Sequence, residues 1–336
     1  MPFNKMPQVS IIIPCYNEEK TIGLLLQSLL EQTFPINDLE VIISDGNSED
    51  HTRDVINQFE LEHPQMVVRV INNLKRNIPS ALNAAIGDAA GEFIIRLDAH
   101  SVPANDYIEL CVADLTSGKG DNVGGVWDIH PSDDRLMAKC ISIAASHRLG
   151  VGDARYRYTT EAGEVDTVPF GAFKRDVFTR VGTFDESLLT NEDYELNVRI
   201  RKNGGHIWLN PAIRAVYFSR PNLPSLINQY WRYGLWKWRM LRSNPGTIRW
   251  RQALPPAFVL SLVVLFVLAF FHPFFGILLG VEFIVYLGVI LSGTVPESIR
   301  SHDVRVGAGV SLAIMTMHLS WGAGFLWSMV KSIFGR

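Results

Sequence analysis

The sequence lacks several features that would point to common classes of protein. Its formal net charge is −3 over 336 residues, whereas nucleic-acid-binding proteins carry a clear basic surplus. Three cysteines without C-x-x-C spacing are too few for a disulfide framework, and we expect them to be reduced and buried. Neither G-x-G-x-x-G nor G-x-x-x-x-G-K-[ST] occurs. We therefore expect no nucleic-acid partner, no dinucleotide-binding motif and no P-loop.

Charge is also scarce in the C-terminal quarter of the chain. From Leu254 onward the charged residues are Glu282, Glu297, Arg300, Asp303, Arg305, Lys331 and Arg336. Three apolar runs lie there, at 254–271, 274–292 and 310–330. A run of 18 residues is about 27 Å long as a helix, which barely spans a bilayer. We therefore expect about three transmembrane helices. Glu282 and His318 lie within the runs and are candidates for a functional role.

The N-terminal part alternates between strands and helices. Short apolar runs predict strands at 9–14, 39–44, 67–71 and 92–97, and helical periodicity predicts helices at 21–30, 52–60 and 80–90. This alternation is typical of βαβ units and predicts an α/β fold with a mostly parallel sheet. The expected organisation is a catalytic domain at 1–222, an interface helix and linker at 223–253, and a membrane domain at 254–336.

Polar residues follow the first two predicted strands. Pro14, Tyr16 and Glu18 follow the first strand, and Asp45 ends the second. Ligands of open α/β sheets bind outside the carboxyl ends of the strands. Tyr16 offers a flat face for a base ring, and Asp45 could accept hydrogen bonds from a uracil or a ribose. The alternative for Asp45 is a turn-forming residue before Gly46.

The strand at 92–97 runs into Asp98-Ala-His100. Two residues apart on an extended chain, Asp98 and His100 point the same way. A carboxylate and an imidazole can hold a divalent cation between a protein and a diphosphate, and the imidazole favours Mn²⁺ somewhat over Mg²⁺. The alternative is an aspartate that caps the next turn and a histidine on the surface.

Acidic residues also begin a helix that runs from Asn191-Glu-Asp193 to about Lys202. Acids in a first turn are explained by the helix dipole alone. The same dipole would keep Asp193 ionised, as a general base requires.

A helix at 225–242 interleaves aromatic residues with arginines and lysine. Such a helix suits a membrane interface, with aromatics in the headgroups and cations toward anionic lipid. Cations from Arg232 to Arg251 precede the first apolar run, which predicts a cytoplasmic catalytic domain on a multi-pass protein of the inner (plasma) membrane.

Four motifs in order resemble those of the inverting, GT-A-fold family-2 glycosyltransferases. They are Pro14-x-Tyr-Asn-Glu18, Ser44-Asp-Gly-Asn-Ser48, Leu97-Asp-Ala-His100 and Asn191-Glu-Asp193. The sequence is most similar to the succinoglycan-type membrane glucosyltransferase branch, over roughly residues 8–250. Gln229-x-x-Arg232-Tyr233 also resembles the Q-x-x-R-W motif of membrane synthases.

The resemblance implies a role for each matching residue. Nucleotide-binding residues would be Pro14, Tyr16, Glu18, Asp45, Asp98 and Arg232. Asp98 and His100 would hold Mn²⁺ or Mg²⁺, and Asp193 would be the base. Acceptor-side residues would be Gly171, Ala172, Phe173, Glu192 and Tyr233.

The expected reaction transfers a hexose to a lipid-linked (polyprenyl diphosphate) saccharide in the synthesis of an exopolysaccharide or a surface glycan. The first candidate for the hexose is glucose, with UDP-glucose as the donor. Membrane lipid and partners in a biosynthetic complex are the other expected contacts. The alternatives are a polyprenyl-phosphate sugar synthase, a processive polysaccharide synthase, a sugar-nucleotide pyrophosphorylase and a non-catalytic membrane assembly subunit. The pyrophosphorylase would need a glycine-rich phosphate loop after the first strand, where Pro14-Cys-Tyr-Asn17 stands.

Overall fold

The computed structural model describes residues 6–245 and 248–334. The chain divides into two compact units: Met1–Asp128 with Tyr158–Tyr217, and Ile129–Arg157 with Phe218–Arg336. The segment 129–157 therefore groups with the C-terminal helices rather than with the sheet that flanks it in sequence.

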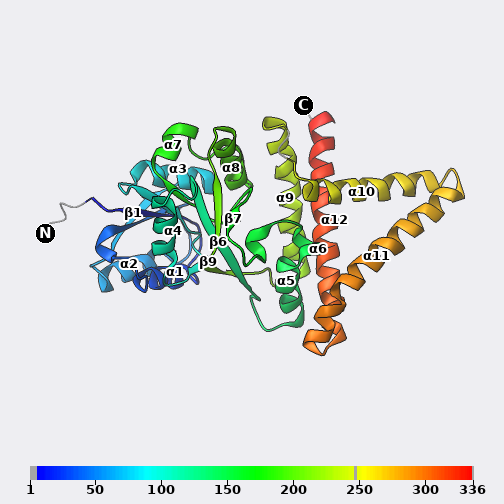
Figure 1. Cartoon of the computed structure of the whole chain (residues 1–336), viewed down its shortest axis with the longest axis horizontal. Coiled ribbons are helices and arrows are strands. Elements are labelled where there is room, and N and C mark those ends of the chain that lie inside the picture. Colours follow the sequence, from blue (N-terminus) through cyan, green and yellow to red (C-terminus); the bar gives the residue numbers. More distant parts are fainter. Residues whose placement is uncertain (1–5, 246–247, 335–336) are drawn as a thin grey trace. The chain divides into compact units, whose positions relative to one another are not determined.

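The first unit is built on a mixed sheet whose strand order is β3-β2-β1-β4-β8-β6-β9-β5, with β7 paired to β9 (Figure 1). The strands are β1 (Val9–Cys15), β2 (Leu39–Asp45), β3 (Val67–Asn72), β4 (Phe93–Arg96), β5 (Val102–Pro103), β6 (Asn122–His130), β7 (Gly163–Glu164), β8 (Ala172–Lys174) and β9 (Ile207–Phe218). Its helices are α1 (Ile22–Leu30), α2 (Thr52–Glu62), α3 (Ile78–Asp88), α4 (Tyr107–Thr116), α7 (Asp176–Val181) and α8 (Glu192–Lys202).

The predicted α/β fold is confirmed, and its parallel part consists of the four strands expected from the sequence. Strand β1 pairs in parallel with β2 and with β4, and β2 pairs in parallel with β3. Beyond β4 the pairing changes, because β8 runs antiparallel to both β4 and β6. The carboxyl ends of β1, β2 and β4 consequently lie at one edge of the sheet.

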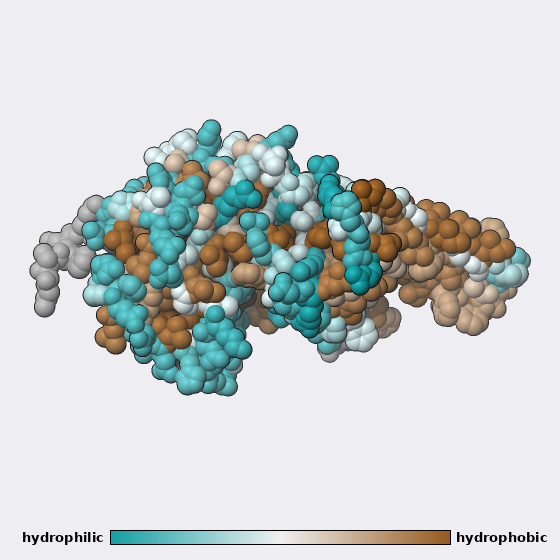
Figure 2. All heavy atoms as spheres, turned by 90° about the horizontal axis from the view of Figure 1, so that it is seen from below, coloured by the Kyte–Doolittle hydropathy of each residue, from teal (hydrophilic) through white to brown (hydrophobic). Residues whose placement is uncertain are grey.

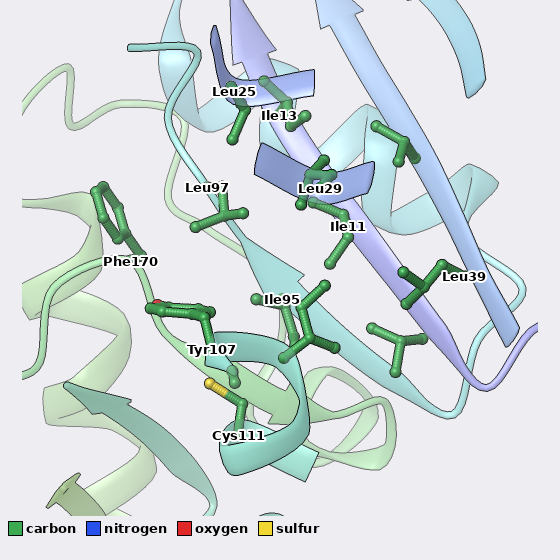
Figure 3. Packing of buried hydrophobic residues seen from close by; sticks show 14 of the residues in the cluster. Ile11, Ile13, Leu25, Leu29, Leu39, Ile95, Leu97, Tyr107, Cys111 and Phe170 are labelled. Carbon is green, nitrogen blue, oxygen red and sulfur yellow. The ribbon is translucent and has the colours of Figure 1, made fainter. Parts of the chain in front are cut away.

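The core of this unit lies between the sheet and the helices α1, α2 and α4 (Figure 3). Ile11 and Ile13 of β1 belong to this core together with Leu25 of α1 and Tyr107 of α4. Successive residues of a strand point to opposite faces, so Ile12, also fully buried, faces the other side. Burying both faces explains why the strands read as continuous apolar runs.

The second unit is helical. It contains α5 (Leu136–Ser146), α6 (Arg148–Val151), α9 (Leu223–Ser243), α10 (Trp250–Ala269), α11 (Pro273–Ser301) and α12 (Val304–Phe334). By length and composition, α10, α11 and α12 could each cross a membrane. Helix α10 begins four residues before the run 254–271 and ends two residues before the end of that run, while α11 and α12 extend the runs 274–292 and 310–330 at both ends.

Candidate active site

Tyr16 follows β1 and is partly exposed to solvent. Its side chain is 42% exposed, and the guanidinium of Arg76 lies 5.5 Å from the ring centroid. Gly46 backs the ring, since a Cβ there would lie 3.1 Å from Tyr16 Cδ2. Pro14 pairs with Ser44 across β1 and β2. A ring held in this way suits the stacking of a planar base.

Asp45 is fully buried and already has partners within the protein. Ser48 Oγ donates to its Oδ1 at 2.5 Å, and Arg53 Nε donates to its Oδ2 at 2.6 Å. This arrangement agrees with the turn-forming alternative, because Asp45 closes the loop before α2. Arg53, which the sequence motifs do not single out, brings a cation to the same strand end.

Hydrogen bonds join the loop after β1 to the loop after β2. The backbone N–H of Asn17 donates to Ser48 Oγ at 2.9 Å, and Asn17 Oδ1 accepts from the N–H of Glu49 at 2.8 Å. Asn17 has φ +55°, a left-handed conformation that asparagine tolerates. Glu18 Oε1 lies 3.0 Å from His100 Nδ1. The three strand-end motifs therefore meet at one edge.

Asp98 follows β4 and is held by the arginine two residues before it. Arg96 Nε donates to Asp98 Oδ1 at 3.1 Å, and Arg96 Nη1 donates to Glu192 Oε1 at 3.0 Å. Arg96 and Glu192 are both buried, while the side chain of Asp98 is 24% exposed. Arg96 thus connects the end of β4 to the first turn of α8.

Asp98 and His100 provide one oxygen donor and one nitrogen donor within reach of solvent, a set that Mn²⁺ accepts. Among residues 6–245 and 248–334, no three His, Cys, Asp or Glu side chains are grouped so that they could hold a metal. A divalent cation at Asp98 and His100 would therefore need further oxygen ligands from water or from a bound diphosphate. The residues fit a metal that is shared with a nucleotide.

Asp193 lies in the first turn of α8, whose N-cap is Asn191 in the left-handed region at φ +68°. Its Oδ1 accepts from the N–H of Tyr194 at 2.7 Å. The first N–H groups of a helix have no partner within the helix, and the dipole favours a negative charge at this end. The first turn of α8 is therefore a suitable place for an acidic side chain.

The charge of Arg96 interacts with Asp98 and with the two acidic residues at the start of α8. Although burial opposes its charge, Asp98, Glu192 and Asp193 together raise the pKa of Arg96. Burial, opposed by Arg96, raises the pKa of Glu192 to about 7. The sequence motifs did not identify Arg96, yet a charged residue within the buried strand Phe93–Arg96 was a signal for it.

The segment expected on the acceptor side has an unusual backbone. Phe170 has φ +60° and Gly171 has φ +98°, and the carbonyl of Gly171 accepts from the N–H of Arg96 at 3.0 Å. Ala172 and Phe173 are buried, and their backbone pairs with β4 on one side and β6 on the other. Glu192 pairs with Arg96 inside the protein. The acceptor role of these residues remains a prediction.

The remaining predicted residues lie in the second unit. Arg232 is exposed on α9, and the hydroxyl of Tyr233 accepts from Gln229 Nε2 at 3.1 Å; their proposed contacts with the donor and the acceptor remain predictions. Glu282 and His318, the two candidates within the apolar runs, each contact a residue of another helix. Glu282 Oε1 accepts from Ser261 Oγ at 2.5 Å, and His318 contacts the hydroxyl of Tyr286 at 3.0 Å.

The chain is similar to several known proteins. The family model described as "Glycosyl transferase family 2" matches residues 10–182. The "Succinoglycan biosynthesis protein ExoA" of Rhizobium meliloti is 30% identical over 328 residues, covering 94% of this chain and 93% of that protein. A "Dolichyl N-acetyl-alpha-D-glucosaminyl phosphate 3-beta-D-2,3-diacetamido-2,3-dideoxy-beta-D-glucuronosyltransferase" of Methanococcus voltae is 27% identical and covers 96% and 97%.

Two solved structures share the fold. The mannosyltransferase PcManGT of Pyrobaculum calidifontis, in complex with GDP-Man and Mn²⁺, has a TM-score of 0.60 at 20% identity and covers 99% of this chain and 89% of that one. S. aureus TarS 1-349 with UDP-GlcNAc has a TM-score of 0.51 at 16% identity, with coverage of 98% and 93%.

Proposed function

Because the chain belongs to glycosyltransferase family 2 and is therefore a glycosyltransferase, we propose that it transfers a hexose with inversion from a nucleotide sugar to a lipid-linked saccharide. Our first candidate for the donor is UDP-glucose. The observation that carries the proposal is the pairing of Arg96 with both Asp98 and Glu192. It connects the strand end proposed for the diphosphate to the helix turn that carries the proposed base.

In the proposed reaction the oxygen of an acceptor hydroxyl attacks the anomeric carbon while the bond from that carbon to the nucleoside diphosphate breaks. Asp193 receives the proton of the hydroxyl, and the nucleoside diphosphate leaves with the electron pair of the broken bond. The attack is in line with the leaving group, so the configuration inverts, and a UDP-α-sugar gives a β-linked product. Tyr16 would stack on the base, and Arg53 would add positive charge near the nucleotide.

The proposed cofactor is Mn²⁺ or Mg²⁺ held by Asp98 and His100. When bound, the cation would supply Lewis-acid stabilisation of the negative charge that develops on the diphosphate. The complex of PcManGT with Mn²⁺ supports a divalent ion in this fold.

The acceptor part of the proposal is supported by two relatives. One is named for succinoglycan biosynthesis and the other for transfer to a dolichyl sugar phosphate. The three C-terminal helices that are long and apolar enough to cross a membrane fit a lipid-linked substrate. We propose that the protein resides in the inner membrane with its catalytic domain on the cytoplasmic side. We also propose that its partners in a complex are further members of the same biosynthetic system.

The experiment that tests the function is a panel of UDP- and GDP-sugars incubated with the purified protein, Mn²⁺ and lipid extract from the native host. Mass analysis should show one added hexose on a lipid-linked saccharide and release of UDP. A sugar phosphate ester would instead indicate a polyprenyl-phosphate sugar synthase, and a ladder of masses a processive enzyme. Failure of every donor to release its nucleotide would contradict the proposal.

A further inference from the structure

The three apolar helices of the second unit differ in how the protein surrounds them. Of the 18 consecutive residues that are most apolar in each helix, 6% are buried inside the structure in α10 and 6% in α11. In α12 half of them are buried. Large apolar side chains are exposed along the length of α10 and α11, among them Leu260, Val263, Phe266, Ile277 and Ile284. Figure 2 shows apolar atoms covering most of the surface of these two helices. Helices apolar on every side are suited to a surrounding of lipid.

Helix α12 exposes one stripe instead. Its exposed large apolar residues include Leu312, Leu319, Trp327, Val330 and Phe334. At 100° per residue these five positions fall within a sector of about 80°, and Val304 and Ile333, near the two ends of the helix, widen it to about 140°. The other sides of α12 pack against α5, α9 and the ends of α10 and α11. Protein therefore covers most of α12, and lipid can reach this helix from one side only.

Helix α9 runs alongside α12 in the same direction. Its N-terminal residues Leu226 and Tyr230 share a buried cluster with Val310 and Met317. Further along both helices, Trp238 Nε1 donates to Ser332 Oγ at 2.9 Å.

Glycines let the two backbones approach each other between these contacts. A Cβ on Gly234 would lie 2.1 Å from the carbonyl oxygen of Trp321, and one on Gly324 would lie 2.3 Å from that of Trp231. The two helices therefore share one orientation in the membrane.

Helix α12 also crosses the base of the hairpin that α10 and α11 form. The last turns of α11 meet α12 near its start, where Thr294 and Ser311 hydrogen-bond at 2.7 Å. The first turns of α10 meet α12 near Gly322, where a Cβ would lie 2.5 Å from the carbonyl oxygen of Pro255. These two points on α12 are about 16 Å apart at 1.5 Å per residue. Figure 1 shows α10 and α11 leaving α12 and meeting at a distant turn. The hairpin and α12 are therefore not parallel, and only one of the two can stand upright in a bilayer.

The charges on α9 decide between these two orientations. Arg232, Arg239 and Arg242 are exposed on α9, and arginine side chains in the hydrocarbon are costly. An upright α12 would carry α9 and these arginines into the hydrocarbon, while the apolar hairpin would lie across the surface. The opposite orientation buries the apolar hairpin and leaves the arginines among anionic headgroups.

We propose that α10 and α11 alone enter the hydrocarbon, as a hairpin, and that α12 lies with α9 in the headgroup region of an anionic bilayer, on the side from which the hairpin enters. Arg300, Arg305 and Lys331 then lie on the same side as Arg232, in keeping with the bias of basic residues toward the cytoplasm. This orientation differs from the three spans that the apolar runs suggest, and it does not depend on the proposed reaction.

Single cysteines test the orientation in the full-length chain, because the three native cysteines are buried. We would introduce Ser243→Cys, Arg300→Cys and Lys331→Cys, each at an exposed position, and label sealed right-side-out and inverted membrane vesicles with a membrane-impermeant maleimide. We expect Lys331→Cys to be labelled in the same vesicles as Ser243→Cys and Arg300→Cys. Labelling of Lys331→Cys from the opposite side would overturn the proposal.

A depth measurement decides the orientation even if a position labels poorly. Leu319→Cys on the stripe of α12 and Val264→Cys on α10 would carry nitroxide spin labels in vesicles that contain anionic lipid. We expect the Leu319→Cys label to lie near the boundary between headgroups and acyl chains, with a higher ratio of nickel to oxygen collisions than the Val264→Cys label in the hydrocarbon. Equal depths for the two labels would show that α12 spans the bilayer, and the proposal would be wrong.

Discussion

Arg96 and Glu192 form an ion pair buried inside the first unit, with Nη1 and Oε1 3.0 Å apart. They are 96 residues apart in the sequence and join the end of β4 to the first turn of α8. Arg96 also pairs with Asp98, so one guanidinium fixes the orientation of the proposed metal ligand and of the residue beside the proposed base. The following predictions concern this arrangement and the helices of the second unit.

Arg96→Met should leave two carboxylates near one another without their cation. Removing one partner of a buried ion pair costs about 3–5 kcal/mol, and Asp98 would lose the contact that orients it. We expect a lower free energy of unfolding and weaker Mn²⁺ binding, measured by denaturant titration and by the EPR signal of free Mn²⁺. The double variant Arg96→Met/Glu192→Gln should regain part of the stability.

A matched control for Arg96 is Arg69→Met. Arg69 also pairs with two carboxylates, Glu40 at 2.6 Å and Asp88 at 2.9 Å, but its side chain is 40% exposed. Its loss should cost less stability and leave Mn²⁺ binding unchanged. Wild-type Mn²⁺ affinity in Arg96→Met would show that Arg96 does not position Asp98.

Asp193→Asn should slow turnover at least about a hundredfold, since general bases contribute about 10²–10⁴ in rate. Nucleotide binding should stay close to the wild-type value, because the amide keeps the size of the carboxylate. Steady-state kinetics and UDP titration would measure the two effects. Asp176→Asn, another acid in the first turn of a helix, is the control and should turn over normally; an active Asp193→Asn enzyme would remove the base from the mechanism.

Asp98→Ala should abolish the dependence of UDP binding on Mn²⁺, since Asp98 is the proposed oxygen ligand. His100→Ala should weaken that dependence rather than abolish it, because the carboxylate and the diphosphate remain. Calorimetric titration of UDP with Mn²⁺ or with EDTA measures the effect. Equal UDP affinity of the wild-type protein in Mn²⁺ and in EDTA would contradict a metal at this site.

The buried carboxyl of Glu192 should make stability depend on pH. Its pKa is raised to about 7 by burial, so between roughly pH 4.5 and pH 7 the folded state binds more protons here than the unfolded state. The contribution of Glu192 to stability therefore falls as the pH rises through this window and is constant above it. Glu192→Gln should flatten that decline by on the order of 1–3 kcal/mol, measured by unfolding at a series of pH values. A parallel decline in the variant and the wild type would assign the pH dependence to other groups.

Gly234→Ala should destabilise the packing of α9 against α12, because the added Cβ would lie 2.1 Å from the carbonyl oxygen of Trp321. Overpacking typically costs about 1–3 kcal/mol. Gly280→Ala in α11 is the matched control, since a Cβ there meets nothing within 4 Å and alanine is the better helix former. Thermal unfolding in detergent should separate the two variants, and equal melting temperatures would show that α9 and α12 are not packed this closely.

The sequence by itself determined the α/β class and the parallel strands, because strands buried on both faces must be continuously apolar and helices between them must carry an apolar stripe. It also identified the strand-end motifs, since polar residues directly after such strands belong at one sheet edge. It located the apolar helices, because hydropathy is a sum over residues close together in the chain.

Only the tertiary structure decided which side chains pair across the fold. The motifs identified Asp98 and Asp193 separately. The pairing of Arg96 with Glu192, which connects the two sites, joins residues 96 positions apart, and no local pattern encodes such a pairing. The contact of Asp45 with Ser48 is a local turn contact, but its pairing with Arg53 forms only once α2 is in place. The orientation proposed for α12 likewise follows from its neighbours: hydropathy measures how apolar a helix is, and packing decides whether protein or lipid covers it.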